Sequence, residues 1–154
     1  MGHENTKLPP YEEIFATKKG FTDLKEAEKF AAKSHCDWLS VAIGNIHGAV
    51  AEAVRNQKKP VAKLDIGHLK ELHAATKLPI VLHGGSGIEQ EYILRGIENG
   101  IAKINVGTEL RQAYEERLSE TGDIESAREV VFERTRFLIK DFYYISNTAD
   151  IICD

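Results

Sequence analysis

The chain has 154 residues, of which 42% are apolar and 29% are charged, and these values are ordinary for one soluble globular domain. The formal net charge of −4 argues against a nucleic acid or an anionic membrane surface as the main partner, and no apolar run approaches the roughly 20 residues that a membrane helix requires. The polar N-terminus has no apolar export segment, and Cys36 and Cys153 form no C-x-x-C motif, so we expect a cytoplasmic protein with two free thiols.

The N-terminal segment carries little hydrophobic periodicity, and Pro9-Pro10 interrupts any regular element there. We therefore expect residues 1–20 to form a loop or an extension, with one turn around Tyr11 to Ala16. The chain as a whole, residues 1–154, is expected to form a single domain.

A helix followed by a buried strand is predicted next. Thr22 is a suitable N-cap for a helix that runs to about Ser34, because its hydroxyl can accept a hydrogen bond from the first turn. The mostly apolar run from Trp38 to Ile43, which ends at Gly44, is typical of a parallel strand that is covered on both faces. The side chains expected on the inner face of the helix are Leu24, Ala27, Phe30 and Ala31.

The same unit of a helix followed by a strand occurs twice more, and two further helices close the chain. Capping residues and helical spacing of apolar side chains indicate the helices, and short apolar runs indicate the strands. The predicted elements are a helix capped by Asp65, a strand over Leu78–Leu82, a helix from Glu89 to Asn99-Gly100, a strand over residues 102–106, and helices over residues 108–118 and 124–144.

Alternating helices and strands with short connections predict a parallel α/β architecture. An α/β barrel needs eight strands and about 250 residues, whereas only three strands are predicted here. Three strands do not close a barrel, and an open sheet would expose unpaired edges. Periodicity alone leaves two alternatives, which are a small open α/β domain and part of a barrel whose other strands lie elsewhere.

Polar residues follow all three predicted strands. His47, His83 and Asn105 come at the strand ends, and Ser86 and Thr108 follow shortly after the last two of them. Because the carboxyl ends of parallel strands share one edge, we expect these five residues to lie close together. Two histidines in equivalent positions, each followed by glycine, suit a Zn²⁺ ion, although a single histidine at a strand end is more often an ordinary polar residue.

A phosphate pocket is also predicted at this edge. The loop Gly84–Gly87 leads into a helix, so that main-chain N–H groups and the hydroxyl of Ser86 are available to an anion. Asn105 and Thr108 are expected beside this loop, and in barrels the loops after the last two strands frequently bind phosphate. A glycine-rich turn alone would indicate only a tight turn.

Three ordered motifs resemble the class II, zinc-dependent fructose-bisphosphate and tagatose-bisphosphate aldolases. These are the stretches Val41–Gly48, Pro79–Gly87 and Lys103–Arg111. The resemblance implies a (β/α)8 TIM barrel, of which this chain supplies the last three strands and their helices. It also implies reversible aldol cleavage of a ketose bisphosphate to dihydroxyacetone phosphate and an aldehyde phosphate.

The resemblance assigns roles residue by residue. His47 and His83 match two of the three histidine ligands of the catalytic Zn²⁺, and Asn105 matches the asparagine that contacts dihydroxyacetone phosphate and its enediolate. Gly107 stands where fructose-bisphosphate aldolases usually have an aspartate that helps to bind a monovalent cation, and the tagatose-type enzymes have a small residue there. The positions that match substrate-phosphate contacts are Gly48, Gly84, Gly85, Ser86, Asn105, Gly107 and Thr108.

Half of the family's active site has no counterpart in this sequence. The chain contains no His-x-Asp-His segment, which in the family supplies the third zinc ligand and an aspartate acid/base. We therefore expect a truncated chain with poor activity alone, which needs an N-terminal half or another copy of itself. The alternative is a non-catalytic module that binds sugar phosphates or forms oligomers. The preferred epimer stays open, and Lys58, Lys59 and Lys63 are candidates for the second phosphate.

Overall fold

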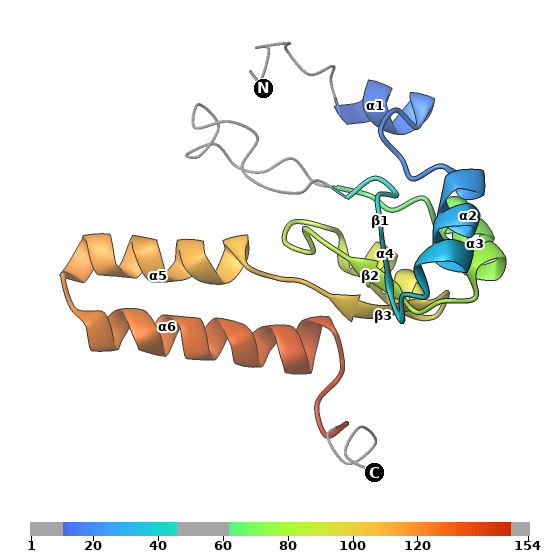
Figure 1. The fold of residues 1–154 in the computed structure, drawn as a ribbon. Helices are drawn as coiled ribbons and strands as arrows, with labels where there is room; N and C mark the ends of the chain where they lie inside the picture. Colours follow the sequence, from blue (N-terminus) through green and yellow to red (C-terminus); the bar gives the residue numbers. More distant parts are fainter. Residues whose placement is uncertain (1–10, 46–61, 149–154) are drawn as a thin grey trace.

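The computed structural model describes residues 11–45 and 62–148. Helices and strands alternate through its first part, and a pair of longer helices follows (Figure 1). No helix in these residues is long and apolar enough to cross a membrane. The elements are α1 (Tyr11–Thr17), α2 (Leu24–Ser34), β1 (Leu39–Val41), α3 (Ile66–Thr76), β2 (Ile80–Leu82), α4 (Gln90–Ile97), β3 (Ile101–Ile104), α5 (Thr108–Thr121), α6 (Ile124–Phe137) and the π-helix η2 (Leu138–Phe142).

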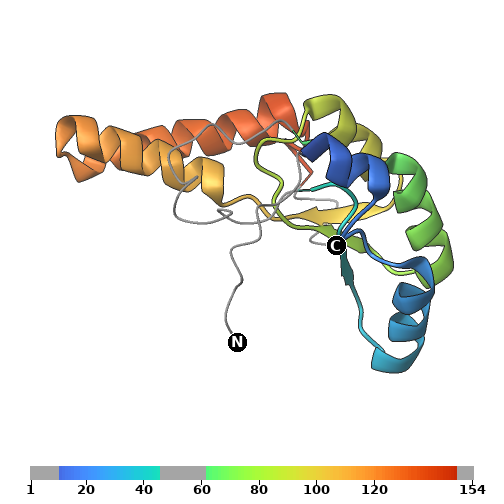
Figure 2. The same cartoon turned by 90° about the horizontal axis from the view of Figure 1, so that it is seen from above.

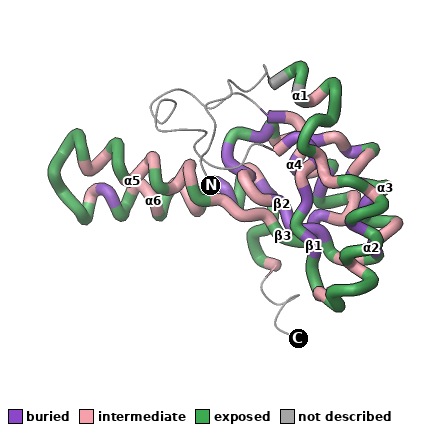
Figure 3. The backbone as a smooth tube through the Cα atoms, turned by 45° about the horizontal axis from the view of Figure 1, so that its top comes forward, coloured by how far each residue is buried: buried purple, intermediate pink, exposed green. Residues whose placement is uncertain are grey.

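The strands form a parallel three-stranded sheet in the order β1-β2-β3, as the sequence predicts. Helices α2, α3 and α4 lie along one side of it, whereas α5 and α6 pack on each other and extend away from the sheet (Figure 2). Buried positions gather around the strands and the inner faces of α3 and α4 (Figure 3). No residue of α5 is buried.

The two faces of the sheet differ in composition. The register aligns Leu39 with Ile80 and Ile101, and it aligns Val41 with Leu82 and Ile104. Five of these side chains belong to the buried core cluster, and Ile104 packs against it. The remaining row, Ser40, Val81 and Lys103, lies on the opposite face, because side chains of registered residues point the same way and successive side chains alternate. Ser40 and Lys103 are exposed, and Val81 is buried but lies outside the core cluster.

The predicted start of α2 is wrong by one residue. The N-cap is Asp23, whose carboxylate accepts the N–H of Glu26 at 2.9 Å. Thr22 instead pairs with Ala42 at the end of β1, since its hydroxyl accepts the N–H of Ala42 and its own N–H donates to the Ala42 carbonyl. Phe30 was expected to face inward, but 54% of it is exposed, because no described element covers that side of α2.

Strand β1 is shorter than the predicted Trp38–Ile43. Its last predicted residue leaves the ladder, because the Ile43 N–H donates to the side chain of Asn45 and the Ile43 carbonyl accepts the N–H of Asp65. Trp38 precedes the strand and is half exposed. The other strands are also shorter, and β3 begins at Ile101 rather than at residue 102.

The capping residues at the helix ends agree better with the sequence prediction than the strand ends do. Asp65 caps α3 as predicted, with its carboxylate accepting the N–H of His68 at 2.9 Å. Gly100, which follows α4, has a φ of +112°, and a Cβ there would lie 2.6 Å from the ring of His73, so this turn requires glycine. The last predicted helix is wrong in its extent, because the α-helical part ends at Phe137 and continues as η2.

Candidate active site

Three polar residues follow the three strands at their carboxyl ends, and they form a continuous line across this edge of the sheet. Asn45 follows β1, His83 follows β2 and Asn105 follows β3. The N–H of Asn105 donates to the carbonyl of Leu82 at 2.8 Å, so pairing continues one step beyond the ends of β2 and β3. The structure therefore brings His83 and Asn105 together, as the topology of a parallel sheet predicts.

The contact between these two side chains is direct. The amide nitrogen of Asn105 lies 3.2 Å from Nε2 and 3.3 Å from Nδ1 of His83. Because these distances are nearly equal, the amide lies against the ring as a whole, and the tautomer of the imidazole decides which nitrogen accepts. Both side chains are half-buried, so the pair is neither fully enclosed nor fully exposed.

Asn45 is a residue of this edge that the sequence reasoning did not single out. Its amide nitrogen donates to the main-chain carbonyl of His83 at 2.9 Å, and its amide oxygen accepts the N–H of Ile43, also at 2.9 Å. The side chain thereby takes the place of a main-chain rung between β1 and β2 beyond the last register pair, Val41 and Leu82. A polar residue shortly after an apolar strand is the sequence signal that indicated the other strand-end residues, and Asn45, which only Gly44 separates from the apolar run, carries the same signal.

The glycine loop after β2 is folded tightly against the end of β3. Gly84 and Gly87 have φ values of +68° and +83°, which favour glycine. The N–H of Gly85 donates to the carbonyl of Asn105 at 3.1 Å, and a Cβ on Gly85 would lie 2.6 Å from Cγ2 of Ile104. Gly85 is thus needed for close packing between the loop and β3, and its N–H is already used within the protein.

The loop also contacts the start of α5. Ser86 is only 5% exposed, and its Oγ accepts the N–H of Glu109 at 3.3 Å. Thr108 is the first residue of α5 and Gly107 is its N-cap. The two predicted parts of the phosphate pocket, the loop after β2 and the start of the helix after β3, are therefore neighbours. Main-chain N–H groups in the first turn of a helix favour an anion.

Packing does not require a glycine at position 107. A Cβ built on Gly107 meets no atom of the described residues within 4 Å, and the φ of −137° is accessible to any residue. The aspartate that fructose-bisphosphate aldolases usually have at this position would therefore fit. Packing among the described residues therefore does not explain the glycine at this position.

The metal prediction rests partly on residues outside the described part of the chain. His47 and Gly48 lie there, as do Lys58 and Lys59, so their predicted roles stay predictions. Within residues 11–45 and 62–148, no three His, Cys, Asp or Glu side chains form a group that could hold a metal ion. The role of His83 as a zinc ligand therefore also stays a prediction.

One carboxylate near the end of β1 has a perturbed pKa. Asp65 accepts the main-chain N–H of His68 and pairs with Lys18, whose Nζ lies 2.8 Å from its carboxylate. Partial burial of Asp65 acts to raise the pKa, but the hydrogen bonds from Lys18 and His68 outweigh it and hold the pKa below the ordinary 3.8. This ion pair joins the α1–α2 connection to α3 and has no contact with His83.

Comparisons with known proteins agree with this geometry. Residues 2–145 match the family of class II fructose-bisphosphate aldolases. The crystal structure of the YdjI aldolase from Escherichia coli K12 matches with a TM-score of 0.64 and 34% sequence identity over 81% of this chain and 46% of that one. The fructose-bisphosphate aldolase of Campylobacter jejuni has the same fold, with a TM-score of 0.62 and 18% identity over 85% of this chain and 48% of its own.

The chain therefore spans less than half the length of these solved aldolases. Its parallel sheet of three strands with helices on one side agrees with part of a TIM barrel rather than with a complete one. The order of the motifs, the contact between the strand-end residues and the family match over most of the chain lead to one conclusion. The chain belongs to the class II fructose-bisphosphate aldolase family.

Proposed function

We propose that this chain carries part of the active site of a zinc-dependent ketose-bisphosphate aldolase. The reaction is the reversible cleavage of a ketose bisphosphate into dihydroxyacetone phosphate and an aldehyde phosphate. The observation that supports this proposal best is the direct contact between His83 and Asn105, to which the Gly84–Gly87 loop is attached through the bond from Gly85 to Asn105. The residues proposed as a metal donor, as a polar contact for the substrate and as a phosphate loop are thus next to one another.

The described residues would bind and orient the three-carbon product. The loop after β2, Ser86 and the start of α5 at Thr108 would hold its phosphate group, which fixes the position of the carbonyl carbon. Asn105 would donate its amide N–H to an oxygen of the substrate at the open side of the His83 ring. A donor in this position favours the enediolate over the ketone, because negative charge develops on that oxygen.

His47 and His83 would hold the Zn²⁺ ion, together with a third ligand from outside this chain. When bound, the ion acts as a Lewis acid on the ketone oxygen. The acid/base residue would also come from the part of the aldolase that this sequence does not contain. Activity therefore requires complementation, and we expect the chain alone to be poorly active.

A second candidate function is the binding of sugar phosphates without catalysis. It is favoured by a specific observation, since the glycine loop after β2 is packed against the end of β3 and the start of α5, where it is proposed to bind a phosphate group. A module of this kind binds dihydroxyacetone phosphate without any need for Zn²⁺. An aldolase site would bind it more tightly when the metal is present.

Calorimetric titration of the chain with dihydroxyacetone phosphate, with and without Zn²⁺, tests both functions. We expect Ser86→Ala and Asn105→Ala to weaken binding at least tenfold, by an amount typical of a lost hydrogen bond to a charged ligand. Ser119→Ala on α5 and Asn99→Ala just after the end of α4 are the matched controls, because these residues lie away from the carboxyl ends of the strands. Equal affinities for all four variants would refute the site, and binding that is independent of Zn²⁺ would favour the second function.

The preferred epimer is the next question. Gly107 supports the tagatose-type group within this family, because a small residue is usual there and the structure has room for a larger one. We propose tagatose bisphosphate as the better substrate of the complemented enzyme. Cleavage rates for the two epimers, measured with the chain and with Gly107→Asp, test this. A preference for fructose bisphosphate in the unmodified chain would refute it.

A further inference from the structure

Glu109 places a carboxylate in the first turn of α5, beside the loop that is proposed to bind phosphate. It follows Thr108, and its main-chain N–H donates to Oγ of the buried Ser86 at 3.3 Å. The positive end of the helix dipole stabilises an acid at this position, but the same end is proposed to hold the phosphate group of the substrate. Two anions at one helix end repel each other, so the charge of Glu109 acts against substrate binding unless another group compensates it.

Arg134 of α6 supplies the compensating charge. Its Nη2 donates to Oε1 of Glu109, and the guanidinium also lies over the ring of Phe137, with 4.8 Å between Cζ and the ring centre. Other ion pairs of these two helices, such as that between Arg128 and Glu125, join residues three or four positions apart on one helix. The pair of Glu109 with Arg134 joins two helices across 25 positions of sequence, so the packing of α5 on α6 brings it about.

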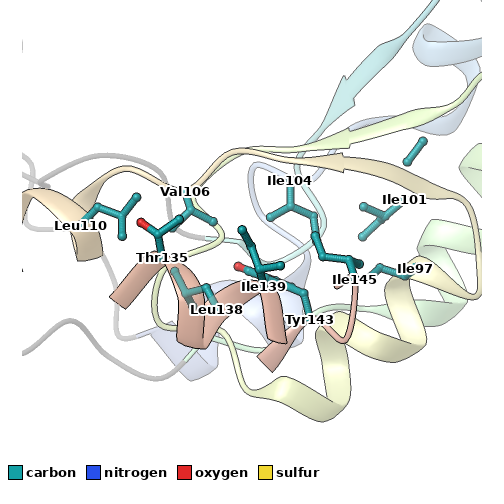
Figure 4. Close-up of a pocket in the computed structure, with 11 residues that line it drawn as sticks. Ile97, Ile101, Ile104, Val106, Leu110, Thr135, Leu138, Ile139, Tyr143 and Ile145 are labelled. Atoms are coloured by element: carbon teal, nitrogen blue, oxygen red, sulfur yellow. The ribbon is translucent and has the colours of Figure 1, made fainter. Parts of the chain in front are cut away.

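An apolar pocket borders this ion pair. Leu110 and Thr135, the residues that directly follow Glu109 and Arg134, line a pocket of about 310 Å³ together with Tyr143 (Figure 4). Burial and the charge of Glu109 raise the pKa of Tyr143 to about 12, against a smaller opposite effect of Arg134, so both charges act at the pocket. Only 22% of the Glu109 side chain is exposed, and a charge in such surroundings is screened less than one in bulk water. Without Arg134, Glu109 would therefore repel a phosphate group at the start of α5.

We propose that Arg134 is a positioning residue of the phosphate site, which neutralises Glu109 and holds its carboxylate on the α6 side of α5, so that the start of α5 stays available to an anion. The inference rests on the proposed function, because it needs a substrate phosphate beside Ser86 and Thr108. A phosphate group carries about 1.5 to 2 negative charges at neutral pH, so an uncompensated carboxylate nearby opposes its binding strongly. Arg134 thereby acts through Glu109 and does not need to touch the substrate.

Calorimetric titration of the full chain with dihydroxyacetone phosphate, at one fixed Zn²⁺ concentration, tests this inference. Arg134→Met keeps an unbranched side chain beside Phe137 but removes the charge, and we expect it to weaken binding roughly tenfold. Arg134→Lys keeps the charge and should weaken binding by less than about threefold. The matched control is Arg128→Met, an equal charge change at an exposed position of α6, which should bind as the unmodified chain does.

Removing the carboxylate as well separates this role from a direct contact with the phosphate. We expect the double variant of Arg134→Met with Glu109→Gln to bind within about threefold of the unmodified chain, because no uncompensated charge remains. Glu109→Gln alone should bind at least as tightly as the unmodified chain. The loss in Arg134→Met should also shrink as the salt concentration rises, since salt screens a repulsion between charges but does not restore lost packing.

Because 41% of the Arg134 side chain is exposed, we expect Arg134→Met to fold, and thermal unfolding of each variant checks this. An affinity of Arg134→Met equal to that of the unmodified chain, or a loss that does not depend on salt, would overturn the inference. A double variant as weak as Arg134→Met would overturn it too, since Arg134 would then contact the phosphate itself. An unmodified chain that does not bind dihydroxyacetone phosphate would refute the proposed function, whereas equal affinities of all variants would refute this inference alone.

Discussion

Replacing Asn45 with alanine removes both hydrogen bonds that its side chain makes at the carboxyl ends of β1 and β2. One joins the amide nitrogen to the His83 carbonyl and the other joins the amide oxygen to the Ile43 N–H, each at 2.9 Å. Ile43 is fully buried, so its N–H has no route to water once the partner is gone. A buried donor left unsatisfied costs about 1–3 kcal/mol, and we therefore expect a loss of about 2 kcal/mol in the free energy of unfolding.

Urea denaturation followed by circular dichroism measures this loss. For a slope of about 2 kcal/mol/M, the midpoint should fall by about 1 M. The matched control is Asn99→Ala, which removes a solvent-exposed bond from the half-buried Asn99 side chain to the Arg95 carbonyl on α4. That variant should lose about 0.5 kcal/mol or less, because water replaces the lost partner.

Asn45→Asp separates the two bonds. The aspartate still offers an oxygen to the Ile43 N–H, but its second oxygen faces the His83 carbonyl, so one attraction becomes a repulsion. We expect a loss of stability close to that of the alanine variant. Equal midpoints for Asn45→Ala and Asn99→Ala would refute the reasoning, since the side chain would then not replace a rung of the sheet.

Three further predictions concern stability. The Tyr143 hydroxyl is buried without a hydrogen-bond partner among the described residues. Tyr143→Phe should therefore unfold at the same or a slightly higher temperature, with a gain of up to about 1 kcal/mol in the free energy of unfolding. Burial raises the pKa of Tyr143 from 10 to about 12, so this tyrosine ionises in the unfolded chain at a lower pH than in the folded chain. The unmodified chain should therefore lose stability between pH 10 and 12, and Tyr143→Phe should lose less. Identical stability profiles of the two proteins at alkaline pH would contradict this. The pKa of Asp65 is lowered, so its contribution to the free energy of unfolding should be present above pH 4 and be lost as the pH falls below about 4. The difference in stability between the unmodified chain and Asp65→Asn should therefore shrink in acid rather than persist. Gly100→Ala should lower the free energy of unfolding by about 2 kcal/mol or more, because the φ of +112° is strained for alanine and the added Cβ meets the His73 ring. Thermal unfolding measures this loss, and a loss under about 0.5 kcal/mol would show that the turn can rearrange.

The sequence was informative about the site because strand ends carry a local signal. The order of apolar runs and polar residues predicts His83 and Asn105 at the same edge of a parallel sheet, and the structure puts their side chains in contact. The predictions for Ser86 and Thr108 placed two segments beside each other, and the bond from Glu109 to Ser86 joins them. The roles of these residues toward zinc and phosphate stay predictions.

Other features depend on contacts between residues that are distant in sequence. Asn45 is 38 positions away from His83, and nothing near it in the sequence shows that its amide continues the ladder between two strands. Thr22 has the chemistry of an N-cap, but its hydroxyl accepts the N–H of Ala42, directly after β1, and Asp23 caps the helix instead. Such competition between a local and a distant partner is decided by the tertiary structure.

The sequence by itself determined the order of helices and strands, the parallel α/β class and the position of the polar residues after each strand, because these follow from periodicity, capping and chain topology. Only the tertiary structure decided which face of the sheet Lys103 occupies. Simple alternation of side chains along β3 would place Lys103 on the same face as Ile101. An irregularity in the register between β2 and β3 instead pairs Ile101 with Ile80 and Lys103 with Val81, and this turns the lysine to the opposite face. A one-residue shift in a strand exchanges the two faces, and that shift arises from pairing with a neighbouring strand rather than from the strand's own sequence.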